Sequence, residues 1–312
     1  MSRHRDSCGQ AFVLTIMFLL VLMGMATAVL DVGSWYRAHR ALQATVDAAA
    51  LAGAQALPKD SGEAIALANE YATKNGGGSM TITLSEDVVP DDTINVEGTR
   101  PAPGFFAKVF GVDSITVRTH ATARAGYPTA AKWVAPIVVN VNHDKLKNCP
   151  DDPPCKDDTS LEYYHLKNNG EQNDGAGSFG FINLTGDNGV GSNELGNWIS
   201  EGFDQLLEVN QDYFVSTGNP FSSNNIKGAL EEKVEEGDTL LFPVYDKLTG
   251  TGNNAKYHIV GFAAFVITSM DLSGNNETFY GHFVSVTWEA VQASKASEIP
   301  PDFGVTNVSL ID

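Results

Sequence analysis

The feature that most constrains this chain is an uninterrupted apolar run near its start. Residues 11–30 read AFVLTIMFLLVLMGMATAVL and contain no formally charged side chain. At ~1.5 Å per residue, a helix of this length crosses a hydrocarbon core of ~30 Å. The sequence therefore predicts a transmembrane helix over residues 11–30.

A cleaved secretory signal peptide is the alternative interpretation of this run. Arg3 and Arg5 provide a basic start, and Ala26-Thr27-Ala28 has the small-x-small pattern of a cleavage site. The apolar run is longer than the ~7–15 residues of a usual signal-peptide core. We therefore expect the span to be retained as the contact with the membrane.

A helical pattern continues past the span. Apolar and small residues recur at three- and four-residue steps from Trp35 to Leu57, and Pro58 would end the helix. Ala49 and Gly53 are small enough to let another helix approach closely, so they form a predicted helix contact face. The alternative is that alanine is frequent here only because it favours helix.

The charge balance excludes one class of partner. The chain has 20 Lys and Arg residues against 38 Asp and Glu residues, which gives a net charge of -18. Such an acidic surface repels phosphates, so no nucleic-acid partner is expected. Apolar residues make up 43% of the chain, enough for a folded core. We expect a single-pass membrane protein with most of the chain outside the cytoplasm.

Two of the three cysteines lie close together. Cys149 and Cys155 bound the segment CPDDPPC, and a disulfide between them is expected for an exported domain. A pair of free thiols and a metal-bound pair remain as alternatives. A zinc site would need two more ligands, and His143 and His165 show no recognisable spacing with the cysteines.

The sequence contains no pattern that indicates catalysis. It lacks H-E-x-x-H, G-x-S-x-G and the G-x-x-x-x-G-K-[ST] phosphate loop. No catalytic, cofactor-binding or metal-ligating residue is predicted. We therefore expect a protein that is not an enzyme and has no cofactor.

Five short segments around the apolar run form a specific combination. They are Gly9-Gln10, Asp31-Val32-Gly33, the stretch from Trp35 to Gln43, Asp47-Ala48-Ala49-Ala50 and Leu51-Ala52-Gly53-Ala54. With these segments, residues 9–57 resemble the N-terminal region of TadG-like proteins of Tad (Flp, tight-adherence) pilus systems. Weaker matches at FGFINL, FPVYD and VGFAAFVI, which begin at Phe179, Phe242 and Val260, extend the resemblance over most of the chain.

This resemblance implies a membrane-anchored component of pilus assembly, which contacts pilins or other assembly proteins outside the membrane. A surface adhesin or ligand-binding module on the same anchor is the alternative. Pilin-type proteins are cut after a glycine before an apolar helix, which makes Gly9 and Gln10 a possible processing site. The sequence departs from that pattern, because Leu14 stands where the fifth mature residue is usually Glu.

The chain as a whole is predicted to be α+β, with the long helix over residues 1–57 followed by two further domains. Residues 58–128 show an α-β-β-α-β order, with a helix that Asp60 and Glu63 begin and that runs to about Asn75. The remaining elements of this module are strands over 80–85, 93–97 and 115–125 and a helix over 103–110 whose Phe105, Phe106, Val109 and Phe110 are expected in the core.

Residues 129–312 are predicted to form a β-rich, antiparallel or barrel-like extracytoplasmic domain, because short apolar runs alternate with Gly and Asn turns. The polar stretch 142–178 is predicted to be an insertion or display loop.

Overall fold

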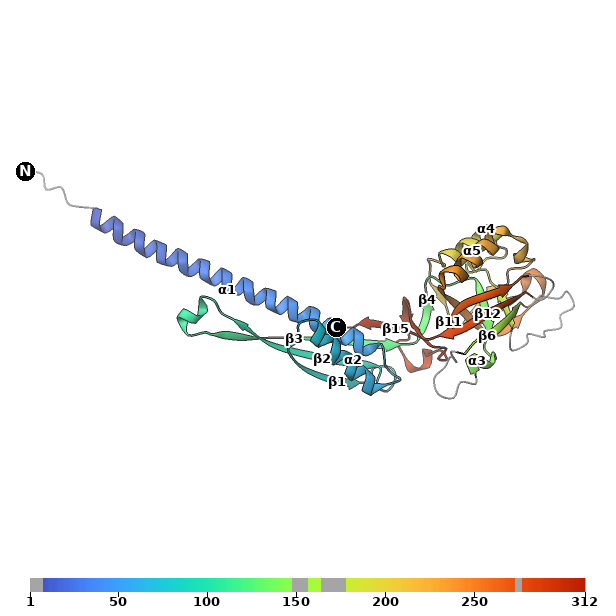
Figure 1. The fold of residues 1–312 in the computed structure, drawn as a ribbon, viewed down its shortest axis with the longest axis horizontal. Coiled ribbons are helices and arrows are strands. Elements are labelled where there is room, and N and C mark those ends of the chain that lie inside the picture. Colours follow the sequence, from blue (N-terminus) through green and yellow to red (C-terminus); the bar gives the residue numbers. More distant parts are fainter. Residues whose placement is uncertain (1–7, 148–156, 164–177, 273–276, 312) are drawn as a thin grey trace, which may run out of the picture. The chain divides into compact units, whose positions relative to one another are not determined.

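The computed structural model describes residues 8–147, 157–163, 178–272 and 277–311 (Figure 1). The chain forms two compact units. We call Met1–Arg124 with Ser309–Asp312 the helical unit, and Ala125–Val308 the barrel unit. The mixed α+β class expected from the sequence is confirmed. The expected boundary at residue 57 falls inside the helical unit.

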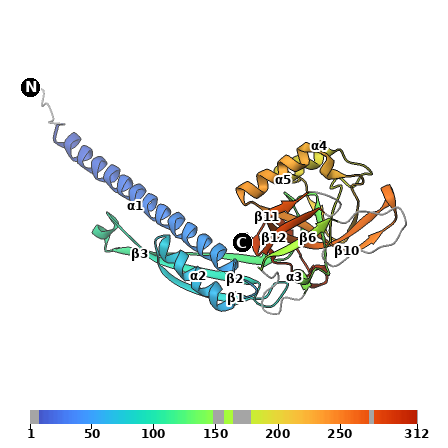
Figure 2. The same ribbon diagram turned by 45° about the vertical axis from the view of Figure 1, so that its right-hand side comes forward.

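One continuous helix, α1 (Cys8–Ala54), begins the helical unit. It is the long blue helix of Figures 1 and 2. In residues 11–25 and 28–30 every side chain is exposed, although most are large and apolar. Among the described residues, α1 is the one helix long and apolar enough to cross a membrane. Its second half is amphipathic, and Leu42, Val46 and Ala50 are fully buried.

A second helix, α2 (Ser61–Lys74), packs against the end of α1. Asp60 caps it, because its carboxylate accepts a hydrogen bond of 2.8 Å from the backbone N–H of Glu63. Its small residues Ala64, Ala68 and Ala72 are buried. The predicted helix start is therefore confirmed.

The two helices cover one face of a sheet. Three of its five described strands, β1 (Ser79–Ser85), β2 (Thr93–Pro103) and β3 (Ser114–Gly126), pair antiparallel in that order. Alternate residues of β2, including Ile94 and Val96, are buried toward the helices. Strand β2 pairs with β3 over its full length, from Thr93 opposite Arg124 to Pro103 opposite Ser114. They thus form one long hairpin.

The expected helix over 103–110 is reduced to a short 3-10 turn, η1 (Ala107–Phe110), at the hairpin tip. The expectation that its apolar side chains are core is wrong. Phe105 is 66% exposed, Phe106 40% and Val109 81%. Helix α1 reaches the tip through Asp31, which binds the backbone of Phe105, and leaves these apolar side chains exposed. The side chain of Phe110 is outside the described ones.

The barrel unit is built on a sheet that closes on itself. Six described strands follow one another around it in the order β10-β5-β7-β6-β12-β11, and β11 pairs with β10 to close the ring. The β10–β5 and β6–β7 pairs are parallel, and the other pairs are antiparallel. The six strands are β5 (Ile137–Asn140), β6 (Thr159–Tyr163), β7 (Ser178–Phe181), β10 (Thr239–Thr249), β11 (Lys256–Asp271) and β12 (Thr278–Val284).

Aromatic side chains are prominent in the core of the barrel unit. The rings of Phe179 and Phe279 stack with centroids 4.3 Å apart, and Phe265 meets Phe283 edge to face at 4.8 Å. Close packing also explains Gly180, where an added Cβ would lie 2.2 Å from the hydroxyl of Tyr257. The barrel-like prediction for this part of the chain thus agrees with the closed sheet.

Part of the predicted polar insertion belongs to the barrel. Residues 159–163 form β6, which pairs with β12 and β7, and Leu161 within it is fully buried. A five-residue strand with one apolar anchor gives too weak an alternation to stand out in a polar stretch. Residues 148–156 and 164–177 lie outside the described part of the chain.

The other elements lie outside this ring of six strands. Helices α4 (Ser192–Ser200) and α5 (Asn224–Glu236) pack on each other, as Figure 2 shows. The remaining elements are α3 (Asp144–Lys147), β4 (Pro128–Ala131), β8 (Leu207–Glu208), β9 (Gln211–Phe214), η2 (Pro220–Ser222), η3 (Gly252–Asn254), β13 (Val286–Thr287), β14 (Ala290–Gln292), η4 (Ala296–Glu298) and β15 (Val305–Leu310).

Candidate functional site

The hairpin tip is attached to α1 by one carboxylate. Asp31 accepts hydrogen bonds from the backbone N–H groups of Phe105 at 2.8 Å, Phe106 at 3.1 Å and Ala107 at 2.5 Å. Asp31 is 3% exposed, and it stands directly after the apolar span. Three convergent N–H donors satisfy a charge that would otherwise be costly to bury.

The electrostatics of this contact follow from its geometry. Burial raises the pKa of Asp31, and the hydrogen bonds from the backbone at Phe105, Ala107 and Phe106 lower it further than burial raises it. The net pKa is therefore below the usual value. The carboxylate stays ionised at neutral pH and holds the tip.

Trp35 makes a second attachment one helical turn further along α1. Its indole N–H donates to the carbonyl oxygen of Pro103 at 3.2 Å. The ring also packs near Leu42, Ala102 and Val117, at the end of the small core between α1 and the sheet. The two attachments fix the end of the hairpin relative to the end of the apolar span.

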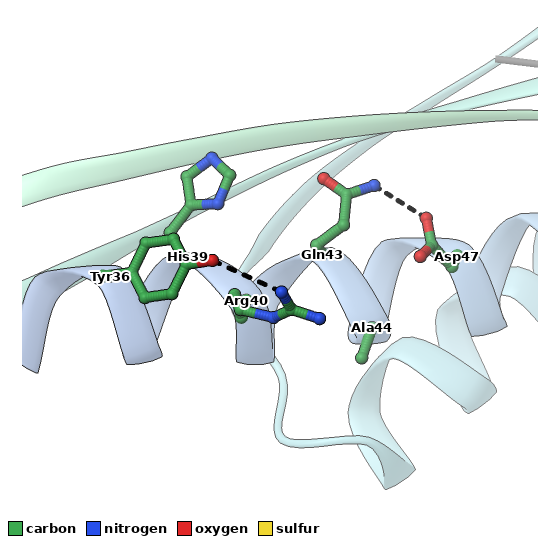
Figure 3. Close-up of a pocket in the computed structure, with 6 residues that line it drawn as sticks. All are labelled: Tyr36, His39, Arg40, Gln43, Ala44 and Asp47. Atoms are coloured by element: carbon green, nitrogen blue, oxygen red, sulfur yellow. Dashed lines mark hydrogen bonds between the residues drawn. The ribbon is translucent and has the colours of Figure 1, made fainter.

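A polar groove lies along α1, beside these attachments. It has a volume of about 440 Å³ and is lined by Tyr36, His39, Arg40, Gln43, Ala44 and Asp47 (Figure 3). Figure 3 shows that all six project from one stretch of α1. Because they recur at three- and four-residue steps, they share a helix face.

Hydrogen bonds order part of this groove. The amide of Gln43 donates to Asp47 at 2.7 Å and to the carbonyl oxygen of His120 on β3 at 2.9 Å. Arg40 donates to the hydroxyl of Tyr36 at 3.3 Å, and both side chains are exposed. The groove therefore offers a cation, a phenol and a carboxylate, which suit polar contacts with another protein. Tyr36, Arg40 and Gln43 were not singled out from the sequence as site residues.

The predicted contact face at Ala49 and Gly53 is occupied from within the chain. Ala49 is fully buried, and a Cβ added to Gly53 would lie 2.5 Å from Cδ1 of Ile94 and 2.8 Å from the carbonyl oxygen of Ala64. The helix that approaches closely is α2 of the same unit. The small residues thus serve internal packing, which leaves no room there for a second molecule.

The other predicted site residues are placed only in part. Gly9 and Gln10 lie in the first turns of α1, with side chains outside the described ones. Cys149 and Cys155 lie outside the described residues, so their disulfide stays a prediction. In the described part of the chain, no group of three or more His, Cys, Asp or Glu side chains is arranged to hold a metal ion.

Comparison with known proteins concerns the first helix. Residues 9–56 match the model of a family described as Putative Flp pilus-assembly TadE/G-like. No curated protein and no solved structure matches the chain. The matched segment nearly coincides with α1, Cys8–Ala54, and so includes both the apolar span and the half that packs in the helical unit. The resemblance seen in the sequence is confirmed for this segment.

Proposed function

We propose that the protein is a membrane-anchored component of Tad/Flp-type pilus assembly that acts through protein–protein contacts outside the membrane. The observation that carries this proposal is the coincidence of the family match, residues 9–56, with one continuous helix. Membership of such a family implies assembly partners, which are pilins or other pilus-assembly proteins.

One half of α1 is suited to anchor the protein in the membrane, and the other half is packed in the helical unit outside it. The first half exposes apolar side chains such as Phe12, Phe18 and Leu20, as a lipid-facing helix does. The second half buries Leu42 and Val46 under the sheet of the helical unit. Because the helix is unbroken, the exterior unit cannot rotate freely about a linker. A rigid connection of this kind suits a component that presents a surface at a set position above the membrane.

The polar groove is the surface we assign to partner contact. It lies on α1 close to the end of the span, and Tyr36 and Arg40 are exposed there. Tyr and Arg are the residue types enriched at protein interfaces. In this proposal most of the chain is extracytoplasmic, and Cys149 and Cys155 form a disulfide in that compartment.

Pilus counts in a deletion strain test the proposal. Loss of the gene should abolish or sharply reduce pili, and the wild-type gene should restore them. Normal pili in the deletion strain would contradict the proposal. Normal pili combined with lost adhesion to a surface would favour the adhesin alternative.

Site-specific photo-crosslinking tests the groove. A photo-reactive amino acid at Arg40 should give adducts with another assembly protein in piliated cells. The matched control is Tyr71, an exposed position on α2 away from the groove. Equal adducts at both positions would contradict a specific role for the groove.

A further inference from the structure

The hairpin tip carries an apolar surface that the helical unit leaves uncovered. Phe105, Phe106, Val109 and Val112 are 66%, 40%, 81% and 41% exposed. Residues 104–112 contain no acidic side chain, and their one charged residue, Lys108, is exposed as well. A contiguous exposed apolar patch marks a contact with another molecule or with a membrane.

The hydrogen bonds of Asp31 to the hairpin tip fix the position of this patch relative to α1. Asp31 binds the backbone of Phe105, Phe106 and Ala107, and it follows the last residue of the apolar span. Figures 1 and 2 both show the turquoise tip beside α1, with the hairpin running back toward the N-terminal half of the helix. If residues 11–30 cross the bilayer, the tip is therefore held at the level where the hydrocarbon ends.

Other residues on α1 are of types that favour the boundary between hydrocarbon and water. Tyr36 is 60% exposed, and Arg37 and Arg40 are exposed within ten positions of the end of the span. Aromatic and basic side chains gather at the boundary between hydrocarbon and water, where rings meet headgroups and cations meet phosphates. The backbone N–H groups around Asp31 also satisfy its carboxylate, and Asp113, next to Val112, is a second carboxylate near the tip and is exposed.

We propose that the hairpin tip is a second membrane contact, in which Phe105, Phe106, Val109 and Val112 enter the boundary between headgroups and acyl chains. Lys108 lies among them and meets the lipid phosphates. The occupant is lipid because the patch is continuous with the lipid-facing surface of α1, to which Asp31 holds it. The inference rests on the proposed membrane anchor. Its consequence is that the helical unit touches the bilayer at two places and cannot tilt freely.

Depth-dependent quenching in lipid vesicles tests the proposal with the full-length protein. In a background with Cys8, Cys149 and Cys155 replaced by Ser, single cysteines carry an environment-sensitive dye. Val109→Cys reports on the tip and Leu19→Cys on the span. Glu97→Cys, on the same hairpin, and Val291→Cys, an exposed apolar position of the barrel unit, are the controls.

Vesicles of phosphatidylcholine and phosphatidylglycerol, with or without brominated acyl chains, provide the quencher. The dyes at 109 and 19 should lose most of their emission in brominated lipid, and the dyes at 97 and 291 should not. Adding Phe105→Ser and Phe106→Ser should restore emission at 109 and leave position 19 quenched. Circular dichroism verifies that each variant is folded.

The outcomes separate this inference from the proposed function. Quenching at 19 without quenching at 109 would overturn the lipid contact of the tip, leave the anchor intact and assign the patch to a protein partner. An unquenched dye at position 19 would overturn the proposed membrane span, and the proposed lipid contact of the tip, which rests on it, would be overturned too. Equal quenching at 109 and 291 would overturn the proposal, because the dye itself would then draw any exposed site into lipid.

Discussion

The carboxylate of Asp31 and the backbone N–H of Phe105 lie 2.8 Å apart, although 74 positions separate them in the chain. The contact joins the end of an apolar span to the tip of a hairpin that begins and ends far from it in sequence. It sets the position of four exposed apolar side chains relative to the helix. The properties of this carboxylate therefore control the most distinctive surface of the helical unit.

Substitution of Asp31 should release the tip. Asp31→Asn keeps one acceptor oxygen but loses the charge, and Asp31→Ala leaves three N–H groups without their acceptor. We expect amide hydrogen exchange over residues 105–107 to speed up in the order wild type, Asn, Ala. Ser34→Ala is the matched control, since its hydroxyl bonds the carbonyl oxygen of Asp31 and not the tip. Unchanged protection in Asp31→Ala would refute the role of this contact.

Asp92 should make the helical unit sensitive to acid. Its carboxylate accepts from the backbone N–H groups of Asp87, Val88 and Val89 at 2.8 to 2.9 Å, and from the hydroxyl of Thr93 at 2.7 Å. Burial raises its pKa, but these hydrogen bonds outweigh burial and lower the pKa below its usual value of 3.8. The stabilisation is fully present above that value and is lost as the pH falls through the folded-state pKa.

Asp92→Asn provides the measurement. At neutral pH the variant should lower the free energy of unfolding by about 1–3 kcal/mol, because buried N–H donors lose an acceptor. The difference from wild type should shrink as the pH falls below 3.8, since the wild-type carboxyl becomes neutral too. Urea unfolding in detergent at a series of pH values shows whether the two curves converge. A constant difference at all pH values would count against the ionised carboxylate as the cause.

The elements that could be predicted from the sequence are those that depend on neighbouring residues alone. Asp60 and Glu63 mark the start of α2, because a cap depends on neighbouring residues alone. The apolar run of α1 also predicts a helix from its own length and composition. The tip could not be predicted in the same way. Phe105 and Phe106 resemble core residues in any pattern of apolar residues. Their exposure follows from their position at the tip of the β2–β3 hairpin, which no local pattern records.

The small residues of α1 predict a contact with a helix but do not identify that helix. Ala49 and Gly53 predict the close approach of a helix, and α2 does approach. The sequence could not say whether that helix belongs to the same chain, because the pattern records only the space available. Asp31 was noted as part of a family resemblance, but its bonds to residues 105–107 depend on tertiary structure. Pro103-Gly104 and Gly111, on both sides of FFAKVF, are local signs of a turn there.

Gly53→Ala should destabilise the helical unit despite the higher helix propensity of alanine. The new Cβ would lie 2.8 Å from the carbonyl oxygen of Ala64 and 3.1 Å from Cβ of Ala68, so α2 would have to move. Overpacking of this kind costs about 1–3 kcal/mol, whereas the propensity gain is about 1 kcal/mol.

Gly33→Ala is the matched control, because nothing lies within 4 Å of a Cβ at that position of α1. It should leave the unit unchanged or slightly more stable. Thermal unfolding followed by circular dichroism in detergent compares the two variants. A higher melting temperature for both would mean that α1 and α2 have room to adjust, and would contradict the close packing described for Gly53.

His143 should make the barrel unit less stable in mild acid. The side chain is 4% exposed and packs edge to face on Phe283, with ring centroids 5.5 Å apart. Its Nδ1 accepts from the backbone N–H of Lys145 at 3.2 Å, which requires that nitrogen to be unprotonated. Burial lowers the pKa of the ring more than the carbonyl oxygen of Ser160 and the charge of Asp144 raise it.

The folded state therefore binds a proton less readily than the unfolded chain, whose histidine has a pKa of about 6.5. Above that pH both states are neutral at this position and the full stability is present. As the pH falls from 6.5 toward the folded-state pKa, the free energy of unfolding should decrease by at most ~1.4 kcal/mol per pH unit for this one group. His143→Asn keeps an acceptor near Lys145 and cannot take up the proton, so its stability should depend less on pH in this window. Urea unfolding of both proteins between pH 7 and pH 5 measures the difference, and parallel curves would show that another group governs the acid response of the barrel unit.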